Sequence, residues 1–141
     1  MTSPSDPDCV FCRIRDGGIP AAVIYETDEV MAIMDAFPSS KGHALVIPKA
    51  HYPDVFDMPP ELLATCAKEA QRLARAQRKA LQPDGATVTQ FNGAAAGQTV
   101  YHYHVHVTPR WEGQSRRSHG KEAADPQELK TLAEQIRAVL D

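Results

Sequence analysis

The chain has 141 residues, enough for one compact domain with a core of its own, and we predict a single domain over residues 1 to 141. Its 15 basic and 18 acidic residues give a formal charge of -3, which leaves no sequence-wide basic surface for nucleic acid or an anionic membrane. No apolar run reaches membrane-spanning length and residues 1 to 8 do not resemble a signal peptide, so we predict a cytoplasmic protein with a disordered tail over residues 1 to 8.

The first chemical motif is the pair Cys9 and Cys12. Three cysteines in the whole chain do not make a disulfide framework of the secreted kind. A redox pair is disfavoured because no strand precedes it. Half of a zinc site is the better interpretation, and two cysteines of no consequence are the alternative. A structural zinc needs two further ligands. The candidates among the histidines are His43, His51, His102 and His119.

Local patterns predict a short helix and three strands in the first part of the chain. The helix covers residues 13 to 20, where glycines and a proline end it. The β-branched and apolar segments 23 to 26 and 30 to 34 predict a hairpin. A third strand covers residues 43 to 47 and ends at Pro48, which cannot donate to a sheet ladder.

The second part of the chain alternates a long helix with further strands. An amphipathic pattern predicts the helix over residues 59 to 81. Strands follow at residues 86 to 92 and 101 to 110, then a mobile loop at 112 to 124 and a last helix capped at Asp125. We therefore predict an α+β fold, in which a mostly antiparallel sheet of about five strands carries the long helix and a C-terminal helix.

Three histidines alternate with apolar or aromatic residues in the strand predicted at 101 to 110. Alternate side chains of a strand share one face, so His102, His104 and His106 would stand about 6 to 7 Å apart. The opposite face would carry Tyr103, Val105 and Val107. Such a row suits a phosphate group, with the middle residue, His104, as nucleophile. The alternatives are a chance alternation on a half-exposed strand and an open three-histidine metal site.

A loop of small residues, 92 to 100, leads into this strand. Its backbone amides can approach an anion closely, and Gln98 and Thr99 add side-chain donors. The combination favours phosphate chemistry, with a metal site as the main alternative. In the loop at 112 to 124, a solvated surface is the simpler interpretation and contact with a leaving phosphate is the alternative. The basic and histidine residues of that loop are Arg116, Arg117, His119 and Lys121.

Residues 9 to 111 resemble the histidine-triad (HIT) family of nucleotide hydrolases and transferases. The family signature, His-x-His-x-His followed by two apolar residues, is similar to residues 102 to 108, and residues 35 to 51 resemble the family's nucleoside-binding segment. The resemblance implies a HIT-like fold, a twofold homodimer and a purine nucleotide substrate. It implies that His104 attacks the α-phosphorus to form a nucleotidyl-histidine, which water then cleaves.

The resemblance also implies the roles of individual residues. Asp35, which by itself could be a turn former, would accept hydrogen bonds from the ribose. The predicted nucleotide contacts are Phe11, Ile14, Ile19, Ile33, Asp35, Asn92, Gln98, Thr99, His104 and His106. The predicted catalytic residues are His102, His104, His106, Gln98 and Thr99. In zinc-bearing members a cysteine pair is completed by two histidines. Here the resemblance implies a structural Zn²⁺ on Cys9, Cys12, His51 and His102.

Four functions stay open at this stage. Hydrolysis of adenosine phosphoramidates or adenylates is the main hypothesis, and a dinucleoside polyphosphate hydrolase is the first alternative. A nucleotide-binding module without turnover would show affinity but form no product. A hydrolase that uses the three histidines as metal ligands would lose activity with a chelator, whereas the covalent route needs no catalytic metal.

Overall fold

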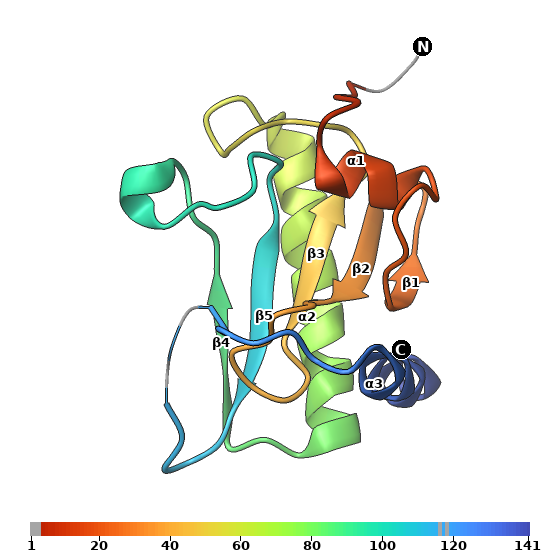
Figure 1. Cartoon of the computed structure of the whole chain (residues 1–141), viewed down its shortest axis with the longest axis vertical. Helices are drawn as coiled ribbons and strands as arrows, with labels where there is room; N and C mark the ends of the chain where they lie inside the picture. The colour runs from red at the N-terminus through yellow and green to blue at the C-terminus, as the bar shows by residue number, and fades with distance from the viewer. Residues whose placement is uncertain (1–3, 116, 118) are drawn as a thin grey trace.

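A computed structural model describes residues 4–115, 117 and 119–141 of the chain, and its five strands form one antiparallel sheet in the order β1-β2-β3-β5-β4 (Figure 1). The strands are β1 Val23–Glu26, β2 Val30–Met34, β3 Ala44–Pro48, β4 Gly85–Thr89 and β5 Val105–Arg110. The helices are α1 Val10–Arg15, α2 Pro60–Leu81 and α3 Pro126–Ala138, with a 3-10 turn η1 at Ala94–Ala96. The predicted α+β fold is confirmed.

Alternation along the strands sends side chains to two cores on opposite faces of the sheet. Val30, Ala32 and Met34 of β2 pack in the core that includes α2, whereas Met31 and Ile33 pack with Phe11 of α1. Figure 1 accordingly shows α2 behind the sheet and α1 in front of it. The front face, between α1 and the ends of the strands, is the face to which the site residues belong.

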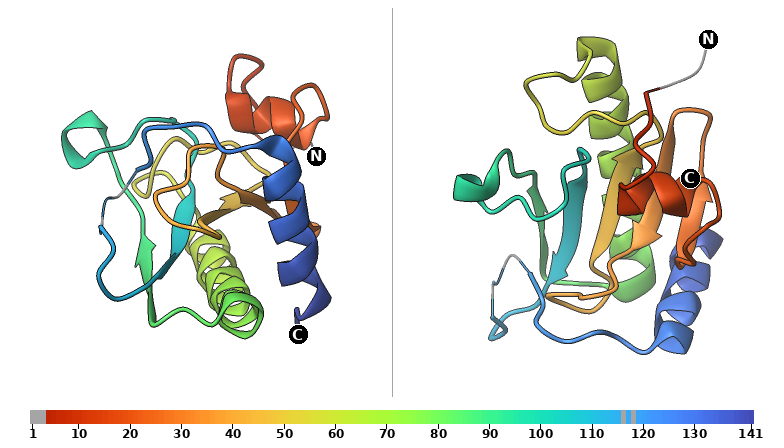
Figure 2. Two further views of the ribbon diagram at one scale, coloured as in Figure 1. Left: turned by 60° about the horizontal axis from the view of Figure 1, so that its bottom comes forward. Right: turned by 45° about the horizontal axis from the view of Figure 1, so that its top comes forward.

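Helix α3 packs against α2 and the β1 side of the sheet (Figure 2). Leu132 and Ile136 bury its apolar side in the α2 core. The predicted cap is present, since the Asp125 side chain accepts a hydrogen bond from the Gln127 backbone N–H. Among the residues that the structure describes, no helix has both the length and the apolar composition to cross a membrane.

The first helix begins earlier than predicted. It covers Val10–Arg15 instead of residues 13 to 20. The Cys9 sulfur accepts a hydrogen bond from the Cys12 backbone N–H at 3.5 Å, so Cys9 acts as the N-cap. Gly17 then adopts a φ of +84°, which ends the helical path before Pro20. The earlier start places both cysteines at one end of α1.

The histidine segment also differs from the prediction, because β5 begins at Val105 and not at Tyr101. The Tyr103 backbone N–H donates to the Tyr52 carbonyl at 2.7 Å, so this part of the chain bonds to the loop after β3 instead of a strand. The predicted division of faces is nevertheless confirmed. Tyr103, Val105 and Val107 lie in the α2 core, and the alternating histidines lie on the other side.

The N-terminal tail and the loop after β5 both contact the domain. The His51 N–H donates to the Pro4 carbonyl at 2.7 Å, and Arg13 Nε donates to the Pro7 carbonyl at 2.8 Å. Mobility of residues 1 to 8 and of residues 112 to 124 stays a prediction. Arg116 lies outside the described residues.

Candidate active site

One cavity, of about 990 Å³, collects most of the residues that the sequence predicts to bind a nucleotide. It opens on the front face of the sheet, beside α1. The predicted residues that line it are Phe11, Ile14, Ile19, Ile33, Asp35, Thr99, His104 and His106. The apolar members form one end, toward α1 and β1, and the histidines lie beside them. The structure therefore joins an apolar wall suited to a base with the polar groups of the triad.

The backbone fixes the tautomer of His104. Its Nδ1 lies 2.7 Å from the His102 carbonyl oxygen, which can only accept, so Nδ1 carries the proton. The lone pair of the neutral ring is therefore on Nε2. The side chain is 6% exposed, and burial lowers the pKa of His104, which keeps the ring neutral. A neutral imidazole with its lone pair on Nε2 is the form that a nucleophile requires.

A second chain of hydrogen bonds orients His106. The Ser39 backbone N–H donates to His43 Nδ1 at 3.0 Å, so the proton of neutral His43 is on Nε2. That nitrogen lies 2.9 Å from His106 Nδ1, which must accept. The proton of His106 is consequently on Nε2, where the ring can donate to a phosphate oxygen. Burial, with the neighbouring histidines, lowers the pKa of His106 to about 3 and that of His43 to about 4.

Asp35 lies at the end of β2 and lines the same cavity. Its Oδ1 accepts from the Phe37 backbone N–H at 2.8 Å, and its Oδ2 lies 3.4 Å from His43 Nε2. Burial raises the pKa of Asp35, although the Phe37 N–H opposes this by stabilising the charged form. Asp35, His43 and His106 place ligand-type atoms within 4.8 Å of one another, and the hydrogen bond from His43 to His106 and the contact between Asp35 and His43 account for this proximity.

The side chains of Asn92 and Gln98 form hydrogen bonds with the backbone, and neither residue lines the cavity. Gln98 Oε1 accepts from the Gly93 N–H, and Gln98 Nε2 donates to the Pro53 and Val100 carbonyls. Asn92 Oδ1 accepts from the Val55 N–H at 2.7 Å. These bonds shape the small-residue loop. The predicted phosphate contact of the two side chains stays a prediction, whereas exposed Thr99 already faces the cavity.

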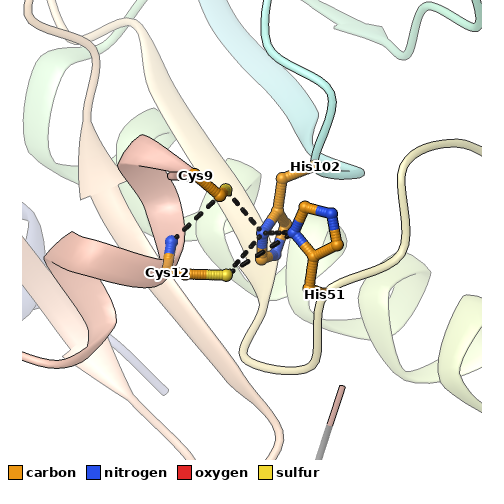
Figure 3. A group of neighbouring side chains, drawn as sticks. All are labelled: Cys9, Cys12, His51 and His102. Atoms are coloured by element: carbon orange, nitrogen blue, oxygen red, sulfur yellow. Dashed lines mark hydrogen bonds between the residues drawn. The ribbon is translucent and has the colours of Figure 1, made fainter. Parts of the chain in front are cut away.

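The predicted zinc ligands converge at a second position, beside the triad (Figure 3). Cys9 Sγ lies 3.3 Å from His102 Nδ1, and Cys12 Sγ lies 3.5 Å from His51 Nδ1 and 3.6 Å from His102 Nδ1. The two Nδ1 atoms are 3.1 Å apart. In a tetrahedral zinc site, sulfur and nitrogen ligands lie about 3.5 Å apart and two nitrogens about 3.3 Å apart. The four side chains thus have the spacing of a zinc site.

The hydrogen bond of His102 fits a role as a metal ligand. Its Nε2 lies 2.7 Å from the Pro48 carbonyl oxygen, so Nε2 carries the proton and the Nδ1 lone pair faces the cysteines. A ligand histidine commonly donates its other N–H in this way. Burial lowers the pKa of His102 to about 4, which favours the neutral form that binds metal.

Two histidines beside His106 were not among the predicted site residues, although the sequence analysis considered both as zinc ligands. His43 is fully buried and bonds to His106 across a separation of 63 residues. His119 lines the cavity from the segment after β5, and its ring lies 5.4 Å from that of His106. The sequence carries a signal for His43, the first residue of a predicted strand, but nothing in its spacing pairs that strand with the triad. For His119 the sequence offers only its place in the polar loop at 112 to 124, where contact with a leaving phosphate is the alternative to a solvated surface.

Comparisons with known proteins converge on one family. A family model described as the HIT domain matches residues 16–113. A Hit-like protein involved in cell-cycle regulation from Bartonella henselae superposes with a TM-score of 0.90 at 40% identity, over 98% of this chain and 100% of that chain. A Zn-bound histidine triad family protein from Mycobacterium smegmatis superposes with a TM-score of 0.82 at 41% identity, over 94% of this chain and 92% of that one.

A relative with a named activity is longer than this chain. Adenylylsulfatase HINT3 of Arabidopsis thaliana is 40% identical over 118 residues, which cover 79% of this chain. The match covers 60% of that protein, so the chain spans less than two thirds of the relative's length. The similarity thus covers most of this chain but leaves a large part of the relative unmatched.

Proposed function

Because the chain belongs to the HIT-domain family, we propose that it is a nucleotide hydrolase or nucleotidyl transferase that acts at the α-phosphate of purine nucleotides. The observation that carries this proposal is the tautomer of His104. Its Nδ1 proton is held by the His102 carbonyl, so the Nε2 lone pair belongs to a ring that lines the cavity. The position suits attack on a phosphorus atom.

The mechanism has two steps. The His104 Nε2 lone pair forms a bond to the α-phosphorus, while the bond to the leaving group breaks and its electron pair goes to that group. Water then cleaves the nitrogen–phosphorus bond, which releases the nucleotide and restores His104. His106 Nε2–H donates to a phosphate oxygen, where negative charge builds in the transition state. Thr99 is a second donor on the same side of the cavity.

The nucleoside would occupy the apolar end of the cavity. Phe11, Ile14, Ile19 and Ile33 provide the wall for the base, and Asp35 is placed to accept from the ribose hydroxyls. Zn²⁺ on Cys9, Cys12, His51 and His102 would hold α1 against the segment that carries His104. The proposed role of the metal is structural, and the side chains of His104 and His106 would perform the chemical steps.

The proposed substrates are adenosine 5′-phosphoramidates, cleaved faster than diadenosine polyphosphates. The support is the resemblance of the first half of the chain to phosphoramidase-like members, with Asp35 and an aliphatic base pocket. A second candidate, adenosine 5′-phosphosulfate, is favoured by the activity in the name of the Arabidopsis thaliana relative. All three have the same α-phosphate and differ in the leaving group.

The test is a panel of substrates with identification of products. We expect a higher kcat/KM for the phosphoramidate than for diadenosine polyphosphates, since that ratio measures differential transition-state binding. A clear preference for the dinucleotide would reverse the choice and make Arg117 and Lys121 the first described residues to test as contacts for the extra phosphates. Tight binding with no product from any of the three substrates would instead identify a binding module.

A further inference from the structure

His119 is a histidine of the active-site cavity to which the mechanism above gives no role. It lies in the segment between β5 and α3 and is partly buried. Its ring centroid is 5.4 Å from that of Phe91 and 5.4 Å from that of His106. It lines the same cavity as His104 and His106. The segment after β5 thus places a further imidazole beside the proposed phosphate site.

Backbone contacts hold this part of the segment in place. The Gly120 N–H donates to the Phe37 carbonyl at 3.1 Å, and the Ala124 N–H donates to the Ala36 carbonyl at 2.9 Å. A Cβ at position 120 would overlap the Pro38 carbonyl, so only glycine permits this approach. In Figure 1 the blue segment crosses in front of the lower part of β5 on its way to α3. The position of His119 therefore follows from main-chain bonds next to it.

Two imidazole nitrogens in this cavity are buried without a partner. Among the described residues, neither His106 Nε2 nor His119 Nε2 has a hydrogen-bond partner. Buried polar atoms of native proteins are nearly always satisfied, and a missing partner calls for an explanation such as a ligand. His106 Nε2 has one in the proposed mechanism, the α-phosphate. His119 Nε2 needs a second hydrogen-bond partner close by.

The sheet order indicates which part of a bound nucleotide could provide this partner. The apolar base wall lies at the β1 and α1 end of the cavity. Phe91, which His119 contacts, follows β4 at the opposite edge of the sheet. With the base at one end and the α-phosphorus at His104, the group beyond the phosphorus extends toward Phe91 and His119.

We propose that His119 Nε2–H donates a hydrogen bond to the leaving group and raises kcat/KM for a substrate with an anionic leaving group, such as sulfate, more than for a substrate with a neutral amine. The proposal rests on the function proposed above and adds a determinant of its substrate class. When the bond from phosphorus to a sulfate oxygen breaks, the electron pair stays on that oxygen and sulfate departs as an anion. A donor at that oxygen stabilises the transition state more than the ground state. An amine takes up a proton from water as it departs and develops less negative charge.

The first experiment compares two substrates that differ only in the leaving group. We measure kcat/KM for adenosine 5′-phosphosulfate and adenosine 5′-phosphoramidate with the wild type and with His119→Ala. The expected loss is about 10- to 100-fold for the phosphosulfate, the usual effect of removing a hydrogen bond to a charged group, and less than about threefold for the phosphoramidate. Equal losses on both substrates, or no loss on the phosphosulfate, would overturn the proposal.

Two further variants separate contact from structure. His119→Gln keeps an N–H donor and should recover part of the phosphosulfate activity. Glu122→Ala changes an exposed residue of the same segment and should leave both values within about twofold of the wild type. Failure of His119→Gln to recover any activity, with its melting temperature unchanged, would count against a hydrogen-bonding role.

A binding experiment tests the contact without turnover. In a His104→Ala background, the ratio of the Kd for AMP to that for adenosine 5′-phosphosulfate reports the contribution of the sulfate. Adding His119→Ala should reduce this ratio by about tenfold, and an unchanged ratio would overturn the proposal. If the wild type cleaves neither substrate, the proposed function fails while this measurement still decides the role of His119.

Discussion

At the level of single residues, the three histidines differ in which ring nitrogen carries the proton and which carries the lone pair. His102 donates through Nε2 to a backbone carbonyl and turns Nδ1 toward the cysteines. His104 donates through Nδ1, which leaves the lone pair on Nε2, the atom proposed as the nucleophile. His106 accepts at Nδ1 from His43 and therefore donates at Nε2. The partner of one ring nitrogen decides what the other nitrogen can do.

The first prediction concerns the nucleophile. His104→Ala should lower kcat by several orders of magnitude, because it removes the atom that forms the covalent intermediate. Nucleotide binding should survive, since Asp35, Thr99 and the apolar wall remain. Turnover and calorimetric AMP titration check the two halves of this prediction. Activity within about tenfold of the wild type would show that His104 is not the nucleophile.

The second prediction concerns the buried pair of His43 and His106. In the unfolded chain both have a pKa of about 6.5, whereas burial lowers the values to about 4 and about 3 in the folded protein. Between these limits the unfolded chain binds more protons, so the free energy of unfolding falls as the pH drops from about 7 toward 4.

His43→Gln tests this linkage, because glutamine keeps a donor and an acceptor but does not titrate. Between pH 7 and pH 4 the wild type should lose on the order of 2 to 3 kcal/mol more unfolding free energy than the variant. Urea denaturation at several pH values measures the difference, and any acid release of bound metal affects both proteins alike. Identical pH slopes would show that His43 titrates normally in the folded state.

At the level of secondary-structure elements, helices on opposite faces of the sheet contact the segment that carries the three alternating histidines. Helix α2 reaches β5 and the turn before β3 through Gln77, whose Nε2 donates to the Val107 and Gly42 carbonyls at 2.9 Å each. Helix α1 reaches the triad through Cys9 and Cys12, which face His102. The position of His104 and His106 therefore depends on contacts from both sides.

The third prediction concerns the contact from α2. Gln77→Ala should lower the free energy of unfolding by about 2 to 4 kcal/mol, because two buried carbonyls lose their donor. Gln71→Ala provides a matched control, since Gln71 is an exposed glutamine of the same helix and should change stability by less than about 0.5 kcal/mol. Chemical denaturation of both variants gives the comparison. Equal effects would mean that the buried hydrogen bonds contribute nothing specific.

The fourth prediction concerns the contact from α1. Purified protein should contain about one zinc per chain, and the double variant Cys9→Ser, Cys12→Ser should contain none. The variant should lose thermal stability more than it loses specific activity of the folded fraction, because the metal is proposed as structural. Elemental analysis and thermal denaturation provide the measurements.

The third cysteine provides the control for the zinc measurement. Cys66 is fully buried in the α2 core, where burial raises the pKa of its thiol to about 12. Cys66→Ala should lower stability through lost packing and keep the zinc. A Cys9→Ser, Cys12→Ser protein that retains its metal would show that the ligand set is wrong.

At the level of the whole molecule, the cavity draws on distant parts of the chain. Its walls come from α1, the turn after β2, the loop before β5 and the segment that leads to α3. The apolar residues proposed as the base wall, His104, His106 and His119 therefore line one cavity. The homodimer that the resemblance implies is a separate question of assembly.

The fifth prediction is that the protein is a homodimer in solution. Light scattering coupled to size exclusion should give twice the chain mass of 15.5 kDa. Most soluble oligomers are closed, symmetric homo-oligomers, and twofold dimers are the commonest. A mass of 15.5 kDa that does not change with protein concentration would contradict the prediction.

The sequence alone determined the elements and the chemistry whose signals are local. Alternation of period two predicted which side of the triad segment is core, and the amphipathic pattern predicted α2 nearly to its bounds. The Cys-x-x-Cys spacing predicted half of a metal site, and the resemblance supplied the two histidines that the structure places beside it. Element boundaries were less accurate, because the start of α1 depends on a side-chain cap and the start of β5 on a bond to Tyr52.

Only the tertiary structure decided which polar groups lie around the triad. It joined His43 and His119 to the triad and turned the side chains of Asn92 and Gln98 into the fold. Spacing along the chain describes neighbours a few residues apart, as on one face of a strand or helix. The contact between His43 and His106 spans 63 residues and exists because β3 pairs with β5, a choice made by packing both strands on α2.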